Sequence, residues 1–408
     1  MLKLTIKFNT CLLLFLLLFL KTTNLCCGKL DDLEHLIGNQ DAVLVADSKG
    51  HIVFSKNLDI QLIPASTLKI FTALVSIHYL GSDHKYYTEF YMDRHSNLKI
   101  KGYGDPLIIS EIVMEMIHRL SMQLSSKYNI INDLILDDTY FEVPAVIPGL
   151  NVSYKPYDAP CGALCVNFNT VNFKRNKNGV YVSAESQTPL LPFILPRIKA
   201  SQLDHGRIVL SNQKNEITRY AGHLLLYFLK KEGIRLKGDI KLGKVQKEAD
   251  NLIYKYVSSF SLIETLSKLL EYSNNFIANQ LLITAGVAAY GPPGNLEKGI
   301  RASLIYAKNI LEIDNIQIDE GSGISRKNRI SARDFHKILY AFTPYHSLMR
   351  QTDKLYYKTG TLKGVHTRAG YIKKKNGELY PFVLMINTPG KSPEPVMDII
   401  ERELNYKR

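Results

Sequence analysis

Three short motifs in a fixed order constrain this chain more than any other feature of its sequence. They are S-T-L-K at residues 66–69, S-N-N at residues 273–275 and K-T-G-T at residues 358–361. Each is common when taken alone. Together they supply a nucleophile, a base, a proton relay and an anchor for an anion. The fold must therefore bring Ser66 and Ser273 together although they lie 207 residues apart in the chain.

The first motif is predicted to start a helix. Pro64 suits a helix entry, and apolar side chains recur at helical spacing at Leu68, Phe71, Leu74, Val75 and Tyr79. Lys69 follows Ser66 by three positions, so both side chains lie on one helix face. We expect Ser66 to be the nucleophile and Lys69 its base, provided that burial or a nearby cation lowers the lysine pKa. The alternative is a capping serine beside a surface lysine.

The second motif lies in a short break between two predicted helices, Ser261 to Leu270 and Phe276 to Tyr290. The Ser273 hydroxyl can relay a proton, and the Asn275 amide can donate to a substrate carbonyl. The alternative is that these residues only cap the second helix.

The third motif is predicted to be an extended strand that opens a hairpin. Asn376-Gly377 is a tight-turn signal, and Tyr380 to Ile386 is the returning strand. We expect Lys358 and Thr359 to bind an anionic terminus and Gly360 to let a substrate approach closely. The backbone N–H of Thr361 would then join that of Ser66 as an oxyanion donor. A surface strand that happens to carry a lysine is the alternative.

The spacing between the first two motifs predicts an insertion. Residues 28–85 and 213–408 are assigned to the catalytic domain, with a hairpin from Val43 to Ser55 beside the final strands. Residues 86–212 are predicted to form an inserted β-rich domain. A helix from Glu216 to Lys231 is expected to resume the catalytic domain.

The first 27 residues are predicted to be a secretory signal. Lys3 and Lys7 precede a ten-residue apolar run that ends at Leu20, which is too short to span a bilayer. The alternatives are a membrane anchor or a lipoprotein signal at Cys26 or Cys27. We therefore expect export, to the periplasm.

Signal removal would leave two cysteines, Cys161 and Cys165, which we expect to pair in an oxidising compartment. The sequence contains no recognisable metal-binding motif, so we expect neither a metal nor another cofactor.

Further segments carry a family resemblance. They are G-D-P at 104–106, D-D-T-Y-F at 137–141, A-P at 159–160, V-N-F-N-T-V at 166–171 and E-G-S-G-I-S-R at 320–326. With the three motifs, they make residues 40–390 resemble the D-alanyl-D-alanine carboxypeptidases/endopeptidases of the low-molecular-mass class C penicillin-binding proteins. The chain departs from that pattern at Glu320, where an Asp is usual, and at Cys161 and Cys165.

The resemblance implies a fold and an activity. The fold is of the α/β (α+β) class, with a penicillin-binding/serine β-lactamase-like catalytic domain whose antiparallel sheet is flanked by helices. The activity is hydrolysis of D-Ala-D-Ala in peptidoglycan stem peptides through an acyl-enzyme, with inhibition by β-lactams. Asp138 and Arg326 would flank the pocket for the third stem residue. A serine β-lactamase and a non-catalytic peptidoglycan-binding protein are the alternatives.

The charge narrows the choice of partner. The formal net charge is +13, or +10 without Lys3, Lys7 and Lys21. A basic surface suits an anionic wall polymer or peripheral association with a membrane. Nucleic acid would suit the charge equally, but the predicted export signal argues against it.

Overall fold

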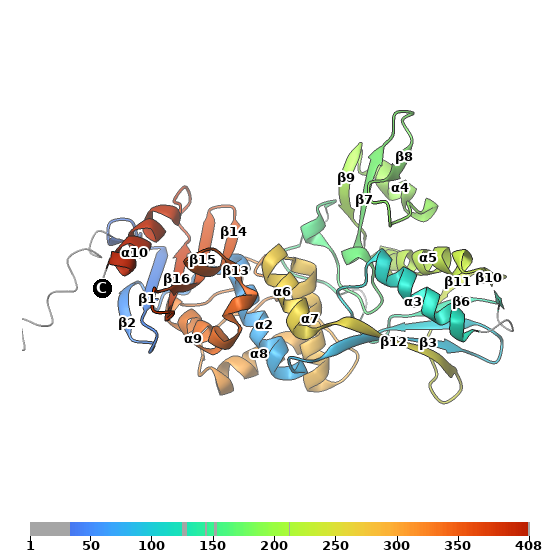
Figure 1. The fold of residues 1–408 in the computed structure, drawn as a ribbon, viewed down its shortest axis with the longest axis horizontal. Helices are drawn as coiled ribbons and strands as arrows, with labels where there is room; N and C mark the ends of the chain where they lie inside the picture. Colours follow the sequence, from blue (N-terminus) through green and yellow to red (C-terminus); the bar gives the residue numbers. More distant parts are fainter. Residues whose placement is uncertain (1–32, 125–128, 143–144, 151–152, 212, 407–408) are drawn as a thin grey trace, which may run out of the picture.

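The computed structural model describes residues 33–124, 129–142, 145–150, 153–211 and 213–406. The predicted signal segment, residues 1–27, lies outside the described residues. Within the part that is described, no helix is both long and apolar enough to cross a membrane. The molecule is elongated, and its two main sheets lie toward opposite ends of the long axis (Figure 1).

The first lobe contains a six-stranded antiparallel sheet. Its order is β13 (Arg350–Gln351), β14 (Leu355–Leu362), β15 (Val365–Lys373), β16 (Leu379–Ile386), β1 (Asp41–Ala46) and β2 (Ile52–Lys56). The predicted hairpins of β1 with β2 and of β15 with β16 are both present. The chain therefore joins its first and last strands in one sheet.

Both faces of this sheet are covered, which explains why all six residues of β1 are buried. Val43 and Val45 pack with the last helix, α10 (Glu394–Tyr406). Ala42 and Leu44 face the opposite way, into the larger core. The side chains of successive strand residues alternate between faces, so the continuous apolar run from Ala42 to Ala46 is expected only in a strand that is covered on both faces.

The larger core is built mainly from helices on the second face of the sheet. They are α2 (Lys69–Leu80), α6 (Leu262–Tyr272), α7 (Asn275–Tyr290), α8 (Leu296–Ile310) and α9 (Ala332–Phe342). All twelve residues from Phe276 to Val287 in α7 are buried, as a sequence that is apolar almost throughout predicts. The predicted sheet flanked by helices is confirmed.

The second lobe is built on a five-stranded sheet. Its order is β11 (Ile240–Leu242), β6 (Leu134–Asp137), β4 (Leu98–Gly102), β3 (Lys85–Met92) and β12 (Asn251–Ser261). The helices α3 (Ser110–Gln123) and α5 (Glu216–Lys231) share its core. β5 (Ile130–Ile131) and β10 (Arg235–Leu236) form a short parallel pair.

The extent of this lobe differs from the predicted boundaries, residues 86–212. Ile217, Leu224 and Phe228 of α5 pack in the core of the second lobe, not in the catalytic core. β12 then pairs with β3 as far as Ser261. An amphipathic helix has one apolar face, but its sequence does not say which core covers that face. The second lobe is therefore longer and more helical than expected.

A small sheet projects from the second lobe (Figure 1). It consists of β8 (Tyr181–Ser183), β7 (Thr170–Arg175) and β9 (His205–Val209), with α4 (Leu195–Ala200) beside it. Phe173, Ile198 and Ile208 join it to the core of the second lobe.

Cys161 and Cys165 do not form the expected disulfide. Both are free and buried, and the Cys165 thiol donates to the carbonyl oxygen of Gly162 at 3.4 Å. Burial raises the pKa of both thiols. The two side chains pack in the larger core as small apolar groups.

Candidate active site

Ser66 lies where a short 3-10 helix, η2 (Ala65–Leu68), continues directly into α2. Lys69, the first residue of α2, is completely buried. Its Nζ lies 2.9 Å from the Ser66 hydroxyl oxygen. The helix start predicted from the sequence therefore places the amine against the hydroxyl.

Two glycines allow the backbone around Ser66 to be enclosed. A Cβ on Gly360 would lie 2.7 Å from the Ser66 backbone nitrogen. Gly323 has a φ of +82°, and a Cβ there would lie 1.9 Å from the carbonyl oxygen of Ala65. Strand β14 and the loop at residues 321–323 thus hold the nucleophile from two sides.

The other contacts of Lys69 suit a neutral amine. Its Nζ donates to Asn275 Oδ1 at 2.8 Å and to the Ser322 carbonyl oxygen at 2.7 Å. A neutral amine has two hydrogens and one lone pair. If both hydrogens are used by these acceptors, the lone pair faces the Ser66 hydroxyl, which is the geometry that a general base requires.

Burial and charge both favour this neutral form. Burial lowers the pKa of Lys69 well below its ordinary value, and the nearby ammonium of Lys358 lowers it further. The carboxylate of Glu320 acts in the opposite direction. Lys358 is itself buried, and this lowers its pKa to about 8. Two buried ammonium groups this close repel each other, so the charge on Lys358 favours a neutral Lys69.

The second motif divides its roles among its three residues. Asn274 caps α7, because its side chain accepts a hydrogen bond from the Ile277 backbone at 3.1 Å. Ser273 ends α6 in a left-handed conformation with φ 54°, and it lines the cleft together with Asn275. Asn274 alone therefore caps α7, which leaves Ser273 and Asn275 at the cleft.

The third motif lies on β14. Lys358 and Gly360 are buried, whereas Thr359 and Thr361 are exposed, as the alternation along a strand requires. Lys358 Nζ donates to the Thr359 carbonyl oxygen at 2.9 Å. Thr361 lines the cleft beside Ser66, whereas Thr359 is not among the described lining residues.

Glu320 stabilises the loop that receives Lys69. It is completely buried, and its carboxylate accepts hydrogen bonds from the backbone nitrogens of Ser322 and Gly323, each at 2.6 Å. Asn328 and Asn279 donate to it at 2.8 and 3.1 Å. The longer Glu side chain, where an Asp is usual, thus fixes the turn that presents the Ser322 carbonyl to Lys69.

The three motifs meet at a cleft of about 810 Å³. Its described lining residues include Ser66, Ser273, Asn275, Thr361 and Arg326. Arg326 also donates to the carbonyl oxygen of Lys363. Lys69 and Lys358 are buried beside the cleft and do not line it.

Asp138 and Arg326 were expected to flank one pocket, for the third stem residue, but of the two only Arg326 is among the described lining residues of the cleft. Asp138 follows β6 and accepts a hydrogen bond at 2.5 Å from Thr218 in α5. Among the described lining residues the acid is Asp319. Asp319 accepts a hydrogen bond from Ser325, so the turn that carries Arg326 also carries this acid.

Sequence reasoning missed several residues that line the cleft. They are Asp319, Lys327 and Lys363, together with Pro148, Gly149 and Tyr157 from the segment between β6 and β7. Asp319 directly precedes the E-G-S-G run, and this position could have indicated that it lies near the site. Pro148, Gly149 and Tyr157 belong to no motif that marks them. No cluster of His, Cys, Asp or Glu suited to a metal occurs within the part of the chain described.

A buried lysine contacts the serine nucleophile at the start of a helix, beside an antiparallel sheet. This arrangement defines a class of acyl-transferring serine hydrolases. The comparison with known proteins specifies the family. Residues 28–193 and 204–355 match the family described as D-Ala-D-Ala carboxypeptidase 3 (S13). The chain belongs to this family and is a serine-type hydrolase.

Individual relatives agree over most of their length. The chain is 25% identical to a D-alanyl-D-alanine carboxypeptidase from an Actinomadura species, over 90% of this chain and 81% of that protein. Penicillin-binding protein 4 of Haemophilus influenzae has a similar fold, with a TM-score of 0.72 at 19% identity, over 92% of this chain and 98% of that one. A predatory endopeptidase from Bdellovibrio bacteriovorus is more distant in fold, with a TM-score of 0.53 at 17% identity, over 89% and 92%.

Proposed function

We propose that this chain is a D-Ala-D-Ala carboxypeptidase that acts on peptidoglycan stem peptides, with Ser66 as its nucleophile. The observation that carries the assignment is the contact of Lys69 Nζ with Ser66 Oγ at 2.9 Å, beside Asn275 and above the buried Lys358. No other described lysine is both completely buried and in contact with a serine hydroxyl at the cleft.

Acylation follows from this geometry. The Ser66 oxygen attacks the carbonyl carbon of the D-Ala-D-Ala bond, and its proton moves to Lys69 Nζ. The C–N bond then breaks. The Ser273 hydroxyl passes its proton to the leaving amine and regains one from Lys69, which becomes neutral again, with the charge of Lys358 tuning this relay. Asn275 holds the substrate backbone. Water hydrolyses the resulting ester and restores the Ser66 hydroxyl.

The developing negative charge needs donors that are already in place. The backbone N–H groups of Ser66 and Thr361 are assigned to this role, because both residues line the cleft and Gly360, which precedes Thr361 on β14, approaches the Ser66 nitrogen closely. Each such donor is typically worth roughly 3–4 kcal/mol in the transition state. Lys358 and Thr359 are assigned to the terminal carboxylate of the substrate, which an ammonium attracts.

β-Lactams are expected to acylate the same serine, because they present a strained amide and a carboxylate in matching positions. A related fold, penicillin-binding protein 4 of Haemophilus influenzae, has been determined in complex with a β-lactam. A serine β-lactamase would differ by fast deacylation of the adduct. A lasting adduct therefore supports the carboxypeptidase and excludes that alternative.

The cleft also suits a longer substrate. Related folds include an endopeptidase, and the charged groups of Arg326 and Asp319 lie at the cleft. An acid and a base there would suit the zwitterionic end of a diaminopimelate side chain. We infer that cross-linked peptides are accepted as well as free stem ends.

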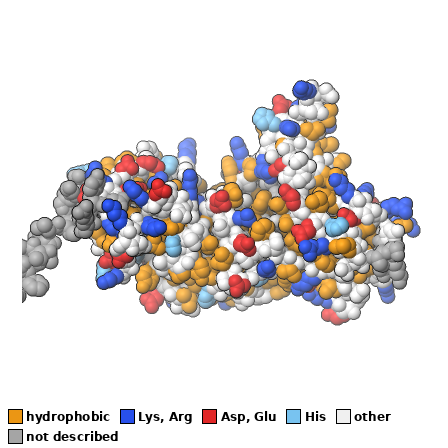
Figure 2. Space-filling view, in the orientation of Figure 1, with side chains coloured by type: hydrophobic (Ala, Val, Ile, Leu, Met, Phe, Trp, Pro, Cys, Tyr) orange, Lys and Arg blue, Asp and Glu red, His pale blue; other side chains and the backbone are white. Residues whose placement is uncertain are grey.

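Export completes the proposal. The apolar run before residue 21 is assigned to a secretory signal, so the mature protein is placed in the periplasm. Basic side chains are spread over the face seen in Figure 2, with acidic groups among them and without a single dominant patch. Peripheral contact with an anionic surface would therefore be weak and sensitive to salt.

The test uses the mature protein and purified muropeptides, with products identified by mass. The expected result is loss of one terminal D-Ala from pentapeptides, together with cleavage of cross-linked dimers. Unchanged muropeptides at high enzyme concentration would favour a non-catalytic binding protein instead.

A further inference from the structure

A second pocket, of about 500 Å³, lies at the end of α6. It is bounded by the last turns of this helix and by the segment in which η8 (Thr343–Leu348) leads into β13. Its lining includes Ser267, Glu271 and Tyr272 on the helix side and Ser347, Met349 and Gln351 on the facing side. None of these is among the described lining residues of the cleft.

The two walls of this pocket continue the two walls of the cleft. On one side Tyr272 lines the pocket, and Ser273, the next residue, lines the cleft. On the other side β13 pairs with β14, with Gln351 opposite Tyr356. Paired residues, and residues two apart along a strand, lie on one face of a sheet, so Gln351 shares a face with Lys358. The pocket is therefore next to the cleft, beyond the start of the third motif.

The direction of the substrate decides which part of it would reach this pocket. The carbonyl that is attacked lies between the assigned N–H donors of Ser66 and Thr361, and the carboxylate of the leaving residue is assigned to Lys358. The leaving group therefore extends along β14 from Thr361 toward Lys358, which is the direction of the pocket. Arg326 contacts Lys363 beyond the opposite end of β14, so the acyl part of the substrate lies at that end.

The two substrates of the proposed function differ in what lies beyond Lys358. In a pentapeptide the leaving group is one D-Ala, which ends at its carboxylate. In a cross-linked dimer the leaving amine belongs to a side chain of a second stem peptide, so methylene groups and then a peptide continue past the carboxylate. Only the dimer can therefore occupy a pocket beyond Lys358.

The lining of the pocket suits this continuation. Tyr272 is 67% exposed, and with Met349 it offers apolar surface to methylene groups. Glu271 and Arg350 add one charge of each sign at exposed positions. Neither of these charged groups forms a hydrogen bond or an ion pair with another described residue. A peptide can pair with both, through a carboxylate and an amide N–H.

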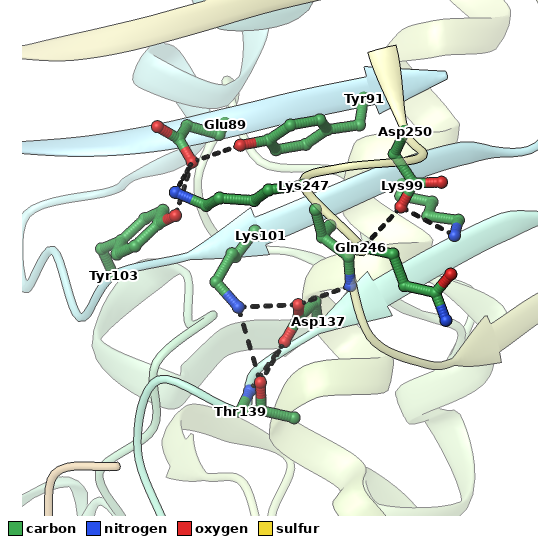
Figure 3. A network of polar contacts seen from close by, with 11 residues as sticks. Glu89, Tyr91, Lys99, Lys101, Tyr103, Asp137, Thr139, Gln246, Lys247 and Asp250 are labelled. Carbon is green, nitrogen blue, oxygen red and sulfur yellow. Dashed lines mark hydrogen bonds and ion pairs between the residues drawn. The ribbon is translucent and has the colours of Figure 1, made fainter. Parts of the chain in front are cut away.

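A polar cluster on the second lobe shows the contrasting case. Lys99 pairs there with Asp250 at 2.9 Å, and Lys101 with Asp137 at 2.8 Å (Figure 3). Asp250 belongs to the connection between β11 and β12, so its pair holds that connection against the sheet. Those charges are used within the protein, whereas the charges beside the cleft remain available to a substrate.

We propose that the pocket at the end of α6 binds the second peptide of a cross-linked stem dimer, on the leaving-group side of the cleft. The inference rests on the proposed function and names the site that serves cleavage of cross-links but not removal of a terminal D-Ala. Tyr272 and the segment at residues 347–351 are then determinants of specificity between the two reactions.

The test compares D-Ala release from a pentapeptide muropeptide with cleavage of a cross-linked dimer by the full mature protein. Tyr272→Ala removes the exposed ring, and Ser347→Trp fills the pocket from an exposed position. The matched controls are Tyr340→Ala on α9, where the tyrosine is 62% exposed, and Ser186→Trp at an exposed site on the small sheet. Binding of both substrates is also measured by calorimetry in Ser66→Ala, alone and combined with each variant, because this protein cannot form the acyl-enzyme.

The expected result is a loss of roughly tenfold in kcat/KM for the dimer in Tyr272→Ala and in Ser347→Trp. D-Ala release and acylation by nitrocefin should stay unchanged in both, because neither substrate has a second peptide. In Ser66→Ala the dimer should bind more tightly than the pentapeptide, and either pocket variant should remove this difference. The two controls should change none of these values.

Unchanged cleavage of the dimer in both pocket variants would overturn the proposal. Equal losses on the dimer and on the pentapeptide would also overturn it, because they would show that the pocket supports Ser273 and not a second peptide. A chain that cleaves neither substrate, but whose Ser66→Ala form binds the dimer more tightly in a manner that Ser347→Trp abolishes, would contradict the proposed function and leave the pocket standing.

Discussion

At the scale of single residues, the account depends on the charge state of Lys69. Its amine is buried, no carboxylate of the described residues contacts it, and it has two hydrogen-bond acceptors besides the Ser66 hydroxyl. The pKa values of Lys69 and Lys358 are lowered for the same first reason, burial, and Lys358 adds its charge to the effect on Lys69. Acylation requires that Lys69 is neutral while the neighbouring Lys358 is still charged.

The first prediction concerns the pH dependence of acylation. The rate constant should rise with pH as Lys69 loses its proton, and should fall above about pH 8 as Lys358 loses its charge. Stopped-flow acylation by nitrocefin between pH 5 and pH 10 measures this profile. In Lys358→Arg the falling limb should move to higher pH, since arginine stays charged. A rate that continues to rise through pH 10 in the unchanged chain would refute the assignment of Lys358.

The second prediction concerns Glu320. In Glu320→Gln, an amide group that donates hydrogen bonds would face the donors of Asn279 and Asn328, so the free energy of unfolding should fall by about 1–3 kcal/mol. The loss of the carboxylate should also lower the pKa of Lys69 and move the rising limb of the profile to lower pH. Denaturant unfolding and the nitrocefin profile measure the two effects. Glu248→Gln, at an exposed position, is the control, and a Glu320→Gln variant as stable as this control would contradict the role.

The third prediction separates two charged residues that the sequence placed together. Arg326→Ala should raise KM several-fold for a diaminopimelate-containing stem peptide, with much less effect on diacetyl-Lys-D-Ala-D-Ala. Asp138→Ala should not show this preference, because Asp138 contacts Thr218 outside the cleft. Selective loss in Asp138→Ala would mean that the cleft extends farther than the structure indicates.

At the scale of elements, periodicity predicted most helices and strands that carry the motifs. The helix after Ser66, the helices around Ser273 and the hairpin that follows Lys358 all lie where apolar spacing and turn residues indicate. Contacts between elements were harder to foresee. The D-D-T-Y-F motif at residues 137–141 follows a strand. Only the packing of α5 explains why Asp138 accepts a hydrogen bond from Thr218. The pairing of Cys161 with Cys165 likewise depends on geometry that spacing does not determine.

The fourth prediction concerns the contact between β14 and the 3-10 helix at Ser66. A methyl group in Gly360→Ala would meet Thr367 Oγ1 at 2.4 Å and the Ser66 nitrogen at 2.7 Å. Overpacking of this kind typically costs about 1–3 kcal/mol. We expect the acylation rate to fall at least tenfold, because the nucleophile must shift.

Gly377→Ala is the matched control for this prediction. Gly377 has a φ of +86° but no neighbour within 4 Å of an added Cβ. The control should therefore lose some stability through backbone strain and keep its acylation rate. A similar acylation rate in Gly360→Ala and in the control would show that this close approach does not position Ser66.

At the scale of the whole molecule, the long insertion leaves the three motifs in one site. The chain leaves the first lobe at β3, builds the second lobe and returns through β12, which pairs with β3 along most of its length. Because the outgoing and returning strands are neighbours, α2 and α6 remain adjacent in the catalytic core. The sequence indicated that an insertion exists, but placed its end at residue 212. The insertion ends near Ser261, because α5 packs in the core of the second lobe.

The most direct test of this account is to locate the acylated residue. The mature protein is treated with a labelled penicillin, digested and analysed by peptide mass spectrometry, beside Ser66→Ala. We predict one labelled peptide, with the adduct on Ser66, and no labelling of the variant. An adduct on another residue, or labelling that persists in Ser66→Ala, would contradict the central claim that the three motifs meet around this serine.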